Sequence, residues 1–181
     1  MECGTPVKSI GRISAEQVAA AIQTVQSMSL AEKVALTEEV FAKQPNLLAS
    51  CLVQPRLGVA AENVDFLLNL LLVCFQAMKQ SRHDWPVISE GAQAQQMQRL
   101  TGTVLFSEDI ADPVLASQAR AQYLTDHPEA PLLAYILHEC NDWLQSLTRR
   151  GAESETDKFV MIAAVNIVNC IAHPEAQNVR A

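Results

Sequence analysis

A histidine and an aspartate one helical turn apart are the first pair in this chain whose types and spacing could do chemistry. His138 and Asp142 lie in the stretch HECNDW, and an i, i+4 spacing places two side chains on the same face of a helix. Such a pair could bind a metal ion or transfer a proton. The apolar residues of this segment, however, recur at positions 133, 137, 140, 144 and 147 and point the other way. We therefore favour an ion pair on a solvated helix face, worth less than about 1 kcal/mol.

A thin line of polar residues runs along an otherwise apolar segment near the end of the chain. Asn166, Asn169 and His173 are spaced i, i+3, i+7, and Asn69 interrupts a second apolar segment in the same way. Buried amides need partners, so these four residues could line a small-molecule pocket or a dimer interface. The alternative, which we favour, is that the line is the solvent-facing edge of a mostly buried helix. If the two apolar helices touch, the asparagines could also satisfy one another.

Metal-binding and catalytic motifs are not found in the sequence. No H-E-x-x-H, C-x-x-C, G-x-S-x-G or glycine-rich phosphate motif occurs. His83 and Asp84 lie beside Trp85 in a linker, where a metal would be poorly held, and His127 before Pro128 is typical of a turn. We expect no metal and no cofactor, and we assign no catalytic residue. Catalysis is therefore the less favoured interpretation, although a triad assembled in space would leave no local motif.

The cysteines predict a reducing environment. Their number is odd, and four of the five (Cys51, Cys74, Cys140 and Cys170) lie in apolar stretches, where a thiol behaves as a small hydrophobic residue. We expect these four to be buried and reduced in the cytoplasm. The fifth, Cys3, falls in the segment that we expect to be flexible.

The elements that must position these residues are marked by helix start and stop signals. Ser14 with Gln17 and Ser29 with Glu32 have the spacing of capping boxes, and Ser154 with Asp157 has a similar arrangement. Proline opens helices at residues 45, 113 and 131, and glycine ends them at residues 58 and 151. The second helix is expected to run through Leu30, Val34 and Phe41 to about residue 43. A glutamine-rich helix is expected over 90–106, with Met97, Leu100 and Val104 facing inward.

Two segments, 60–81 and 154–172, are apolar on most sides. Helices with so little polar surface are packed by neighbours on most faces, so we expect them to form the centre of the molecule. Their most apolar stretches are interrupted by asparagine and are shorter than the roughly 20 residues that cross a bilayer. We therefore expect no membrane partner.

Composition agrees with a folded helical domain. The chain has 181 residues, 49% of them hydrophobic and 18% charged, with a net charge of −7 and scattered basic residues. Disorder and nucleic-acid binding are both disfavoured by these values. We predict an all-α bundle of six to eight helices as one domain over 13–173, with a flexible N-terminus at 1–12 and a frayed tail at 174–181. A faint similarity between PNLLA at 45–49 and PLLA at 131–134 allows a duplicated three-helix unit, although such short matches are common in helical proteins.

Two functions remain open at this level. The first is a non-catalytic interaction module that binds a protein partner or itself, most simply as a homodimer, because apolar helix faces are plentiful and catalytic motifs are missing. The second is a small helical enzyme or ligand sensor with a pocket between the helices at 60–81 and 154–172. The asparagines and His173 would then be its polar groups.

Overall fold

The computed structural model describes residues 12–109 and 113–175, and every regular element in this part of the chain is a helix. It contains eight α-helices and one 3-10 helix, without strands, which confirms the predicted fold class. Cys3, Asp112 and the outer parts of the two expected termini lie outside the described residues. The elements are α1 (Ala15–Ser27), α2 (Leu30–Lys43), α3 (Pro45–Leu52), η1 (Gln54–Leu57), α4 (Ala61–Gln80), α5 (Glu90–Asp109), α6 (Pro113–Asp126), α7 (Ala130–Arg150) and α8 (Asp157–Ala172).

The local start and stop signals act as predicted at most helix ends. Ser14 and Ser29 each accept a hydrogen bond from the backbone three residues on, and the Gln17 and Glu32 side chains complete both capping boxes. Gly58 and Gly151 close η1 and α7 in the left-handed conformation. At α8 the arrangement differs, because the Ser154 hydroxyl bonds Thr156 while its backbone N–H donates to the Asp157 carboxylate. Residues 101–106, the most strand-like stretch of the sequence, continue α5.

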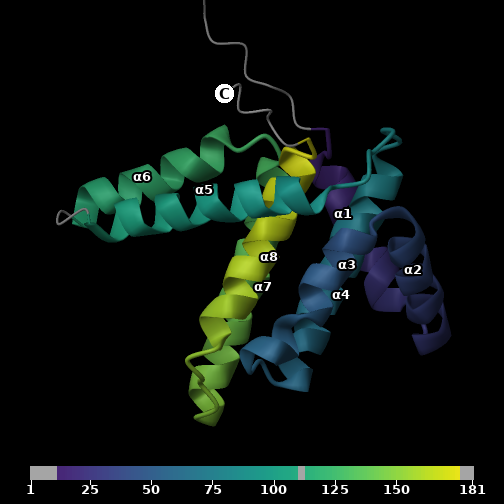
Figure 1. The fold of residues 1–181 in the computed structure, drawn as a ribbon, viewed down its shortest axis with the longest axis horizontal. Helices are drawn as coiled ribbons and strands as arrows, with labels where there is room; N and C mark the ends of the chain where they lie inside the picture. Colours follow the sequence, from purple (N-terminus) through teal and green to yellow (C-terminus); the bar gives the residue numbers. More distant parts are fainter. Residues whose placement is uncertain (1–11, 110–112, 176–181) are drawn as a thin grey trace, which may run out of the picture.

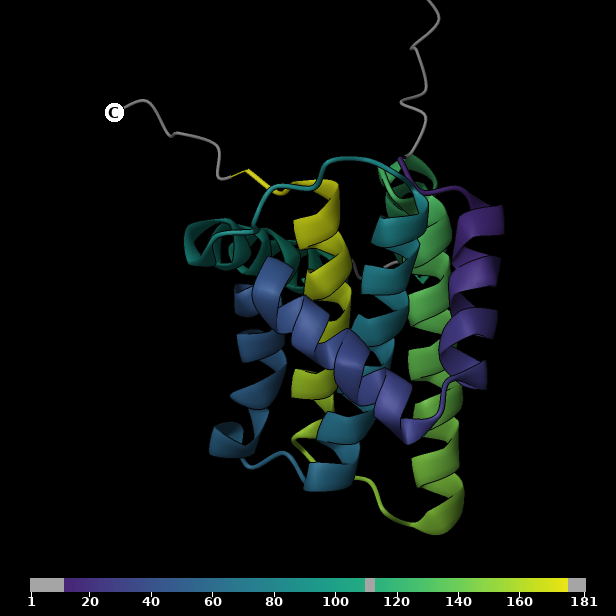
Figure 2. The ribbon, with the colours of Figure 1, turned by 90° about the vertical axis from the view of Figure 1, so that its right-hand side faces the viewer.

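The two apolar helices α4 and α8 pack against each other in the core, as their composition predicts. α1 covers α4, α7 contacts both α1 and α8, and α3 lies against α4 and α8 (Figure 2). Leu67, Leu70, Ile167 and Ile171 are among the large side chains that are fully buried there. By length and hydropathy α4 passes as a membrane span, yet most of it is buried inside the bundle, as in the core helix of a folded domain.

The helical hairpin α5–α6 leaves the bundle and extends to one side (Figure 1). α5 crosses α8 near the C-terminal end of α8, and α6 returns to the start of α7. Among the described side chains of α5, which end at residue 103, the buried ones are Ala92, Gln96 and Leu100, spaced four residues apart. The inward face of α5 is thus rotated from the expected line of Met97, Leu100 and Val104: Leu100 is buried, Met97 is half-buried, and the Val104 side chain lies outside the described part.

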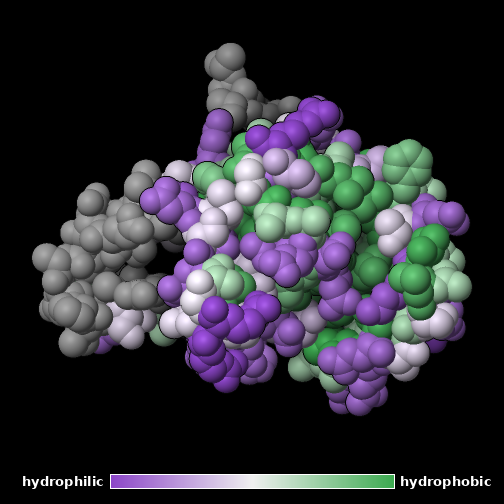
Figure 3. Space-filling model, turned by 90° about the horizontal axis from the view of Figure 1, so that it is seen from below, coloured by the Kyte–Doolittle hydropathy of each residue, from purple (hydrophilic) through white to green (hydrophobic). Residues whose placement is uncertain are grey.

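The apolar residues that mark α2 in the sequence face solvent. Leu30, Val34 and Phe41 are 80%, 51% and 67% exposed, whereas Leu36 and Val40 are buried against the bundle. α2 lies on the outside, crossing the other helices obliquely (Figure 2). The view in Figure 3 shows hydrophobic side chains between hydrophilic ones toward the side on which α2 lies.

Arg12 belongs to the folded domain rather than to a flexible N-terminus. Its guanidinium donates to the carbonyl oxygens of Ile171 (2.6 Å) and Ala172 (3.0 Å) and lies 4.3 Å over the Trp85 ring. Its Nε also pairs with the buried Glu129 carboxylate at 3.3 Å. The domain boundary expected at residue 13 therefore moves to residue 12, because these contacts tie Arg12 to α7, α8 and the 82–89 linker.

The possible duplication finds little support in the helix lengths. The helix that begins at Pro45 has 8 residues, whereas the helix containing Pro131 has 21. Only the order of elements is shared by the two halves.

Candidate functional site

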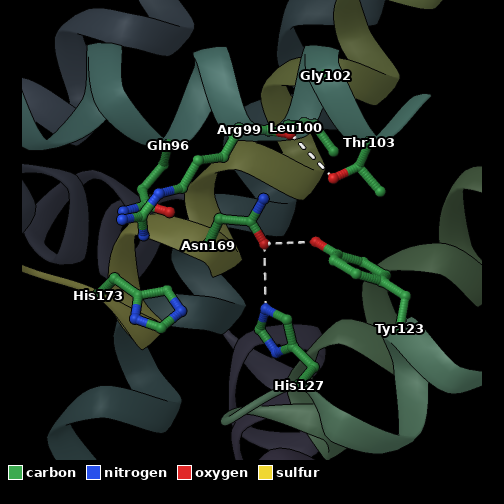
Figure 4. A pocket seen from close by; sticks show the side chains of 9 residues that line it. All are labelled: Gln96, Arg99, Leu100, Gly102, Thr103, Tyr123, His127, Asn169 and His173. Atoms are coloured by element: carbon green, nitrogen blue, oxygen red, sulfur yellow. Dashed lines mark hydrogen bonds between the residues drawn. The ribbon is translucent and has the colours of Figure 1, made fainter. Parts of the chain in front are cut away.

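A cavity of about 520 Å³ lies where α5 crosses α8 and α6 turns into α7 (Figure 4). α5 contributes Gln96, Arg99, Leu100, Gly102 and Thr103 to its wall. The other side is formed by Tyr123 of α6, His127 of the following turn, Asn169 of α8, and His173 directly after α8. Arg99, Gly102 and Thr103 are exposed and form the rim, while Gln96 and Asn169 are buried.

The amide of Asn169 is the centre of a hydrogen-bond cluster in this wall. Its Oδ1 receives hydrogen bonds from the Tyr123 hydroxyl at 2.9 Å and from His127 Nε2 at 3.0 Å. His127 Nδ1 in turn accepts the backbone N–H of Glu129 at 3.1 Å. Because Nδ1 accepts, the neutral ring carries its proton on Nε2 and donates it to Asn169. This chain of bonds fixes the orientation of the Asn169 amide, and its Nδ2 group points toward α5 (Figure 4).

The ionisable groups of the cavity are shifted toward their neutral forms. Burial lowers the pKa of His127, and the hydrogen bond that the ring donates to Asn169 only partly offsets this effect. Burial also lowers the pKa of His173, with further lowering by the positive charges of Arg99 and Arg12. Burial raises the pKa of the Tyr123 phenol. Arg99 is the only formally charged residue in the described wall at neutral pH, and no aspartate or glutamate lines it.

Gln96 is the unusual member of the cavity wall. It is only 2% exposed, and its Nε2 has no hydrogen-bond partner. An unpaired buried donor costs about 1–3 kcal/mol, so a folded protein seldom retains one without a reason. The amide lies on the wall next to Arg99 and on the same side as the His173 ring (Figure 4).

The predicted polar line on α8 is covered by α5 and does not face water. Asn166 and Asn169 are both buried, and Asn166 Nδ2 donates to the Gln93 carbonyl of α5 at 3.4 Å. Two buried atoms at this contact, Gln93 Nε2 and Asn166 Oδ1, have no partner. The polar line is thus one half of a polar helix–helix contact, and the cavity lies at its C-terminal end.

Of the four candidate residues, Asn169 and His173 line the cavity and Asn69 lies elsewhere. The Asn69 Oδ1 accepts a hydrogen bond from Lys33 Nζ of α2 at 3.2 Å. The asparagines consequently do not satisfy one another, although α4 and α8 touch. α4 and α8 pack directly against each other, and the cavity described here opens between α8 and the hairpin.

The weaker candidates are surface residues. His138 Nε2 lies 3.6 Å from an Asp142 carboxylate oxygen, and both side chains are mostly exposed, as the spacing of the apolar residues predicts. The His83 ring contacts the edge of Trp85, whose indole N–H donates to the Met78 carbonyl and the Ser81 hydroxyl. Among the described residues no cluster of three or more histidine, cysteine, aspartate or glutamate side chains is placed to hold a metal ion.

The four expected core thiols are all buried and unpaired with one another. Burial raises the pKa of Cys51, Cys140 and Cys170 to about 12, and that of Cys74 is raised as well. Thiols held in this protonated form are poor nucleophiles. They pack the core and take no part in the cavity.

Sequence patterns missed Gln96, Arg99 and Tyr123 as site residues and identified His127 only as part of a turn. His127 Nδ1 accepts a hydrogen bond within the turn, as expected of a turn residue, whereas Nε2 bonds Asn169 in the cavity wall. A usable signal for Gln96 was its place between Ala92 and Leu100, four residues from each, on the side of α5 that is buried.

A second surface with functional potential is the outer face of α2. Besides Leu30, Val34 and Phe41, the small residues Ala31, Ala35 and Ala42 are exposed there, and Glu38 is the charged residue between them. Large and small apolar side chains therefore alternate along one solvent-facing helix.

Comparison with known proteins gives no relative from which a function could be carried over to either surface. No protein-family model, no curated protein and no solved structure matches the chain.

Proposed function

We propose that this domain binds a small polar molecule in the cavity between the α5–α6 hairpin and α8. The observation that carries the proposal is a cavity of about 520 Å³ in whose wall polar side chains of α5, α6 and α8 converge around Leu100. Pockets with a few convergent polar groups among apolar ones are typical of small-molecule sites.

The contacts of the other polar residues favour binding over catalysis. Both ring nitrogens of His127 and the hydroxyl of Tyr123 are used in the Asn169 cluster. The Thr103 hydroxyl donates to the Arg99 carbonyl of its own helix at 3.0 Å. A general base or nucleophile needs a free reactive atom next to the substrate, whereas the reactive atoms of His127, Tyr123 and Thr103 are already hydrogen-bonded within the protein.

The test uses a side chain that fills the cavity. Thr103 is exposed and lines the cavity, so Thr103→Trp places an indole in the space without disturbing the core. Thr101 is the matched control, because it is also an exposed threonine of α5 whose hydroxyl bonds the carbonyl four residues back, but it does not line the cavity. Thermal melting is measured with a panel of neutral, cationic and anionic small compounds, since a ligand that binds the folded state raises Tm.

We expect at least one compound to raise Tm of the wild type and of Thr101→Trp but not of Thr103→Trp. A panel without any stabilising compound, or stabilisation that persists in Thr103→Trp, would overturn the proposal.

A second candidate function is self-association through α2, with a second copy of this chain as the partner. In an antiparallel pair of α2 helices that cross near Leu36, Leu30 of one copy lies opposite Ala42 of the other, and Phe41 lies opposite Ala31. Leu30 and Phe41 then each meet an alanine in both directions, as a two-fold interface requires, while Val34 lies opposite Glu38. The exposure of Leu30 and Phe41 supports this candidate.

Sedimentation equilibrium over a range of concentrations tests the second candidate. We expect a dimer that Phe41→Glu converts to a monomer, because a carboxylate would be buried against Ala31 of the partner. Leu115→Glu is the control, since Leu115 is an exposed apolar residue of α6, which packs against α5 and α7. A wild type that stays monomeric, or a dimer that Phe41→Glu leaves intact, would rule out this interface.

A further inference from the structure

We propose that the ligand of the cavity carries an uncharged amide group, whose carbonyl accepts a hydrogen bond from Asn169 Nδ2 and whose N–H donates to the ring of His173. This inference rests on the proposed function and names the chemical class of its ligand. Two properties of the wall lead to it: the hydrogen-bonding groups that the end of α8 presents to the cavity, and the charges around them.

The Asn169 amide presents a fixed donor to the cavity. Its Oδ1 accepts hydrogen bonds from Tyr123 and His127, and the Glu129 N–H fixes the His127 tautomer. This arrangement turns Nδ2 toward α5 (Figure 4). Within the described chain, the hydrogen bonds of the Asn169 side chain all involve Oδ1. Unlike Gln96 Nε2, Asn169 Nδ2 is not among the unpaired atoms that are closed off from solvent, so a ligand acceptor can reach it.

The His173 ring supplies the complementary acceptor. His173 directly follows α8, is half-buried and lines the same cavity. Its ring forms no hydrogen bond with the residues that the structure describes. Burial and the positive charges of Arg99 and Arg12 lower its pKa, so the ring is neutral at pH 7 and keeps a nitrogen lone pair. Asn169 and His173 are four residues apart, which places a donor and an acceptor about one helical turn from each other.

The charges around the cavity favour a ligand without a charge of its own. A cation would meet the positive charges of Arg99 and Arg12, and the described wall has no aspartate or glutamate to offset them. An anion would lie at the C-terminal end of α8, where the helix dipole is negative. The charge of Arg99 is not free for it, because Arg99 already has an interaction within the protein. Moving an ion out of water without a free counterion is costly, whereas an amide needs none.

The experiment compares four compounds that share a phenyl ring, because Leu100 and the Tyr123 ring form an apolar part of the wall. Benzamide has a carbonyl and an N–H, acetophenone has the carbonyl alone, and benzoate and benzylamine are charged. Binding is measured by NMR titration of the full chain at pH 7 and constant ionic strength. We expect benzamide to bind about tenfold more tightly than either ion, a difference of 1.4 kcal/mol, and more tightly than acetophenone. Thr103→Trp is expected to abolish the binding of benzamide.

Two substitutions locate the amide group. Asn169→Asp keeps an oxygen for Tyr123 and His127 but replaces the Nδ2 donor with an acceptor, and it is expected to weaken benzamide binding about tenfold or more. His173→Leu removes the acceptor for the ligand N–H at similar size. In this variant benzamide should bind no better than acetophenone, because the N–H that distinguishes the two compounds has lost its partner.

Asn69→Asp and His138→Leu are the matched controls, since they make the same changes outside the cavity. Asn69 bonds Lys33 of α2, and His138 is exposed beside Asp142. Both variants are expected to bind benzamide within about twofold of the wild type. Should Asn169→Asp fail to fold, His173→Leu carries the test by itself.

The outcomes separate this inference from the proposed function. If benzoate or benzylamine binds as tightly as benzamide and Thr103→Trp abolishes that binding, the cavity is a ligand site but the amide assignment is wrong. Benzamide binding that Asn169→Asp and His173→Leu leave unchanged overturns the assignment as well, as does an equal loss in the two controls. If benzamide fails to bind while another compound raises Tm through the cavity, only the assignment falls.

Discussion

Gln96 and Gln44 are both 2% exposed, but only one of them has its amide satisfied. Gln44 donates from Nε2 to the Pro86 carbonyl at 2.8 Å and accepts the Ile88 N–H at 2.9 Å. Gln96 leaves Nε2 unpaired. Replacement of each by methionine, which has a similar shape, should therefore change stability in opposite directions. Gln96→Met is expected to raise the free energy of unfolding by about 1 kcal/mol, and Gln44→Met to lower it by about 2 kcal/mol.

Urea denaturation of the ligand-free protein measures both changes. A loss of stability in Gln96→Met would contradict the interpretation that its Nε2 is an unsatisfied donor.

His127 makes the stability of the domain depend on pH. Burial holds its pKa below the unfolded value of 6.5, so the unfolded chain takes up a proton more readily than the folded one. The stability that this residue contributes is complete above pH 6.5 and is lost as the pH falls toward the folded pKa. We expect the free energy of unfolding to decrease as the pH falls below 6.5. His127→Gln, which keeps a donor for Asn169, is expected to make this decrease shallower.

Comparing the wild type with His127→Gln separates the contribution of His127 from the contributions of the other titrating groups. His173 shifts stability in the same direction and Glu129, whose pKa is raised by burial, in the opposite one, but both are present in each protein. Parallel curves for wild type and His127→Gln would show that the ring does not titrate in this range.

Substitution by alanine is expected to have opposite effects on stability at two glycines, Gly151 and Gly102. Gly151 ends α7 with φ of +63°, a conformation that costs an alanine about 1 kcal/mol. Gly102 lies inside α5, where an added Cβ would have no atom within 4 Å. Gly151→Ala is expected to lower Tm, and Gly102→Ala to raise the stability of α5 by up to about 1 kcal/mol. Circular dichroism melting of both variants checks the signs.

The helices could be predicted from sequence because their ends are encoded locally. The capping residues of α1 and α2, the prolines that open α3 and α7, and Gly151 lie within a few residues of the end that each determines. The face that a helix buries depends on distant neighbours instead. The apolar pattern of α2 gives no indication that Leu36 and Val40 would be the buried pair and Phe41 exposed.

The cavity could be predicted only in part for the same reason. Asn169 and His173 are conspicuous because they interrupt an apolar helix, which is a local contrast. Arg99 and Tyr123 are ordinary residues of polar helices and acquire a role only when the hairpin folds across α8. The crossing of α5 over α8 involves segments about 70 residues apart in sequence (from Gln93 to Asn166, for example), a separation at which spacing rules give no guidance.

At the scale of the whole molecule, the Arg12–Glu129 pair joins the start of the described chain to α7. The Glu129 side chain is fully buried, whereas about a third of the Arg12 side chain is exposed. Removal of Arg12 leaves a buried carboxylate with only backbone donors. We expect Arg12→Met to cost about 2 kcal/mol, below the usual 3–5 kcal/mol for a broken buried pair because Arg12 is partly solvated.

A double-mutant cycle with Glu129→Gln tests this pair. The double variant should be more stable than the sum of the two single losses predicts, because no unpaired charge remains in the core. Additive losses would show that Arg12 acts only through Trp85 and the carbonyls of α8.

The hydrogen bonds from Arg12 to Ile171 and Ala172 also hold the two ends of the described chain close together. The first described residue touches the last residues of α8, so a short covalent bridge between the two ends would follow the native geometry. The exposed turn between α7 and α8 then offers a new place to open the chain. A circularly permuted protein that begins near residue 153 should fold to the same bundle, because the packing of these helices does not depend on where the chain starts.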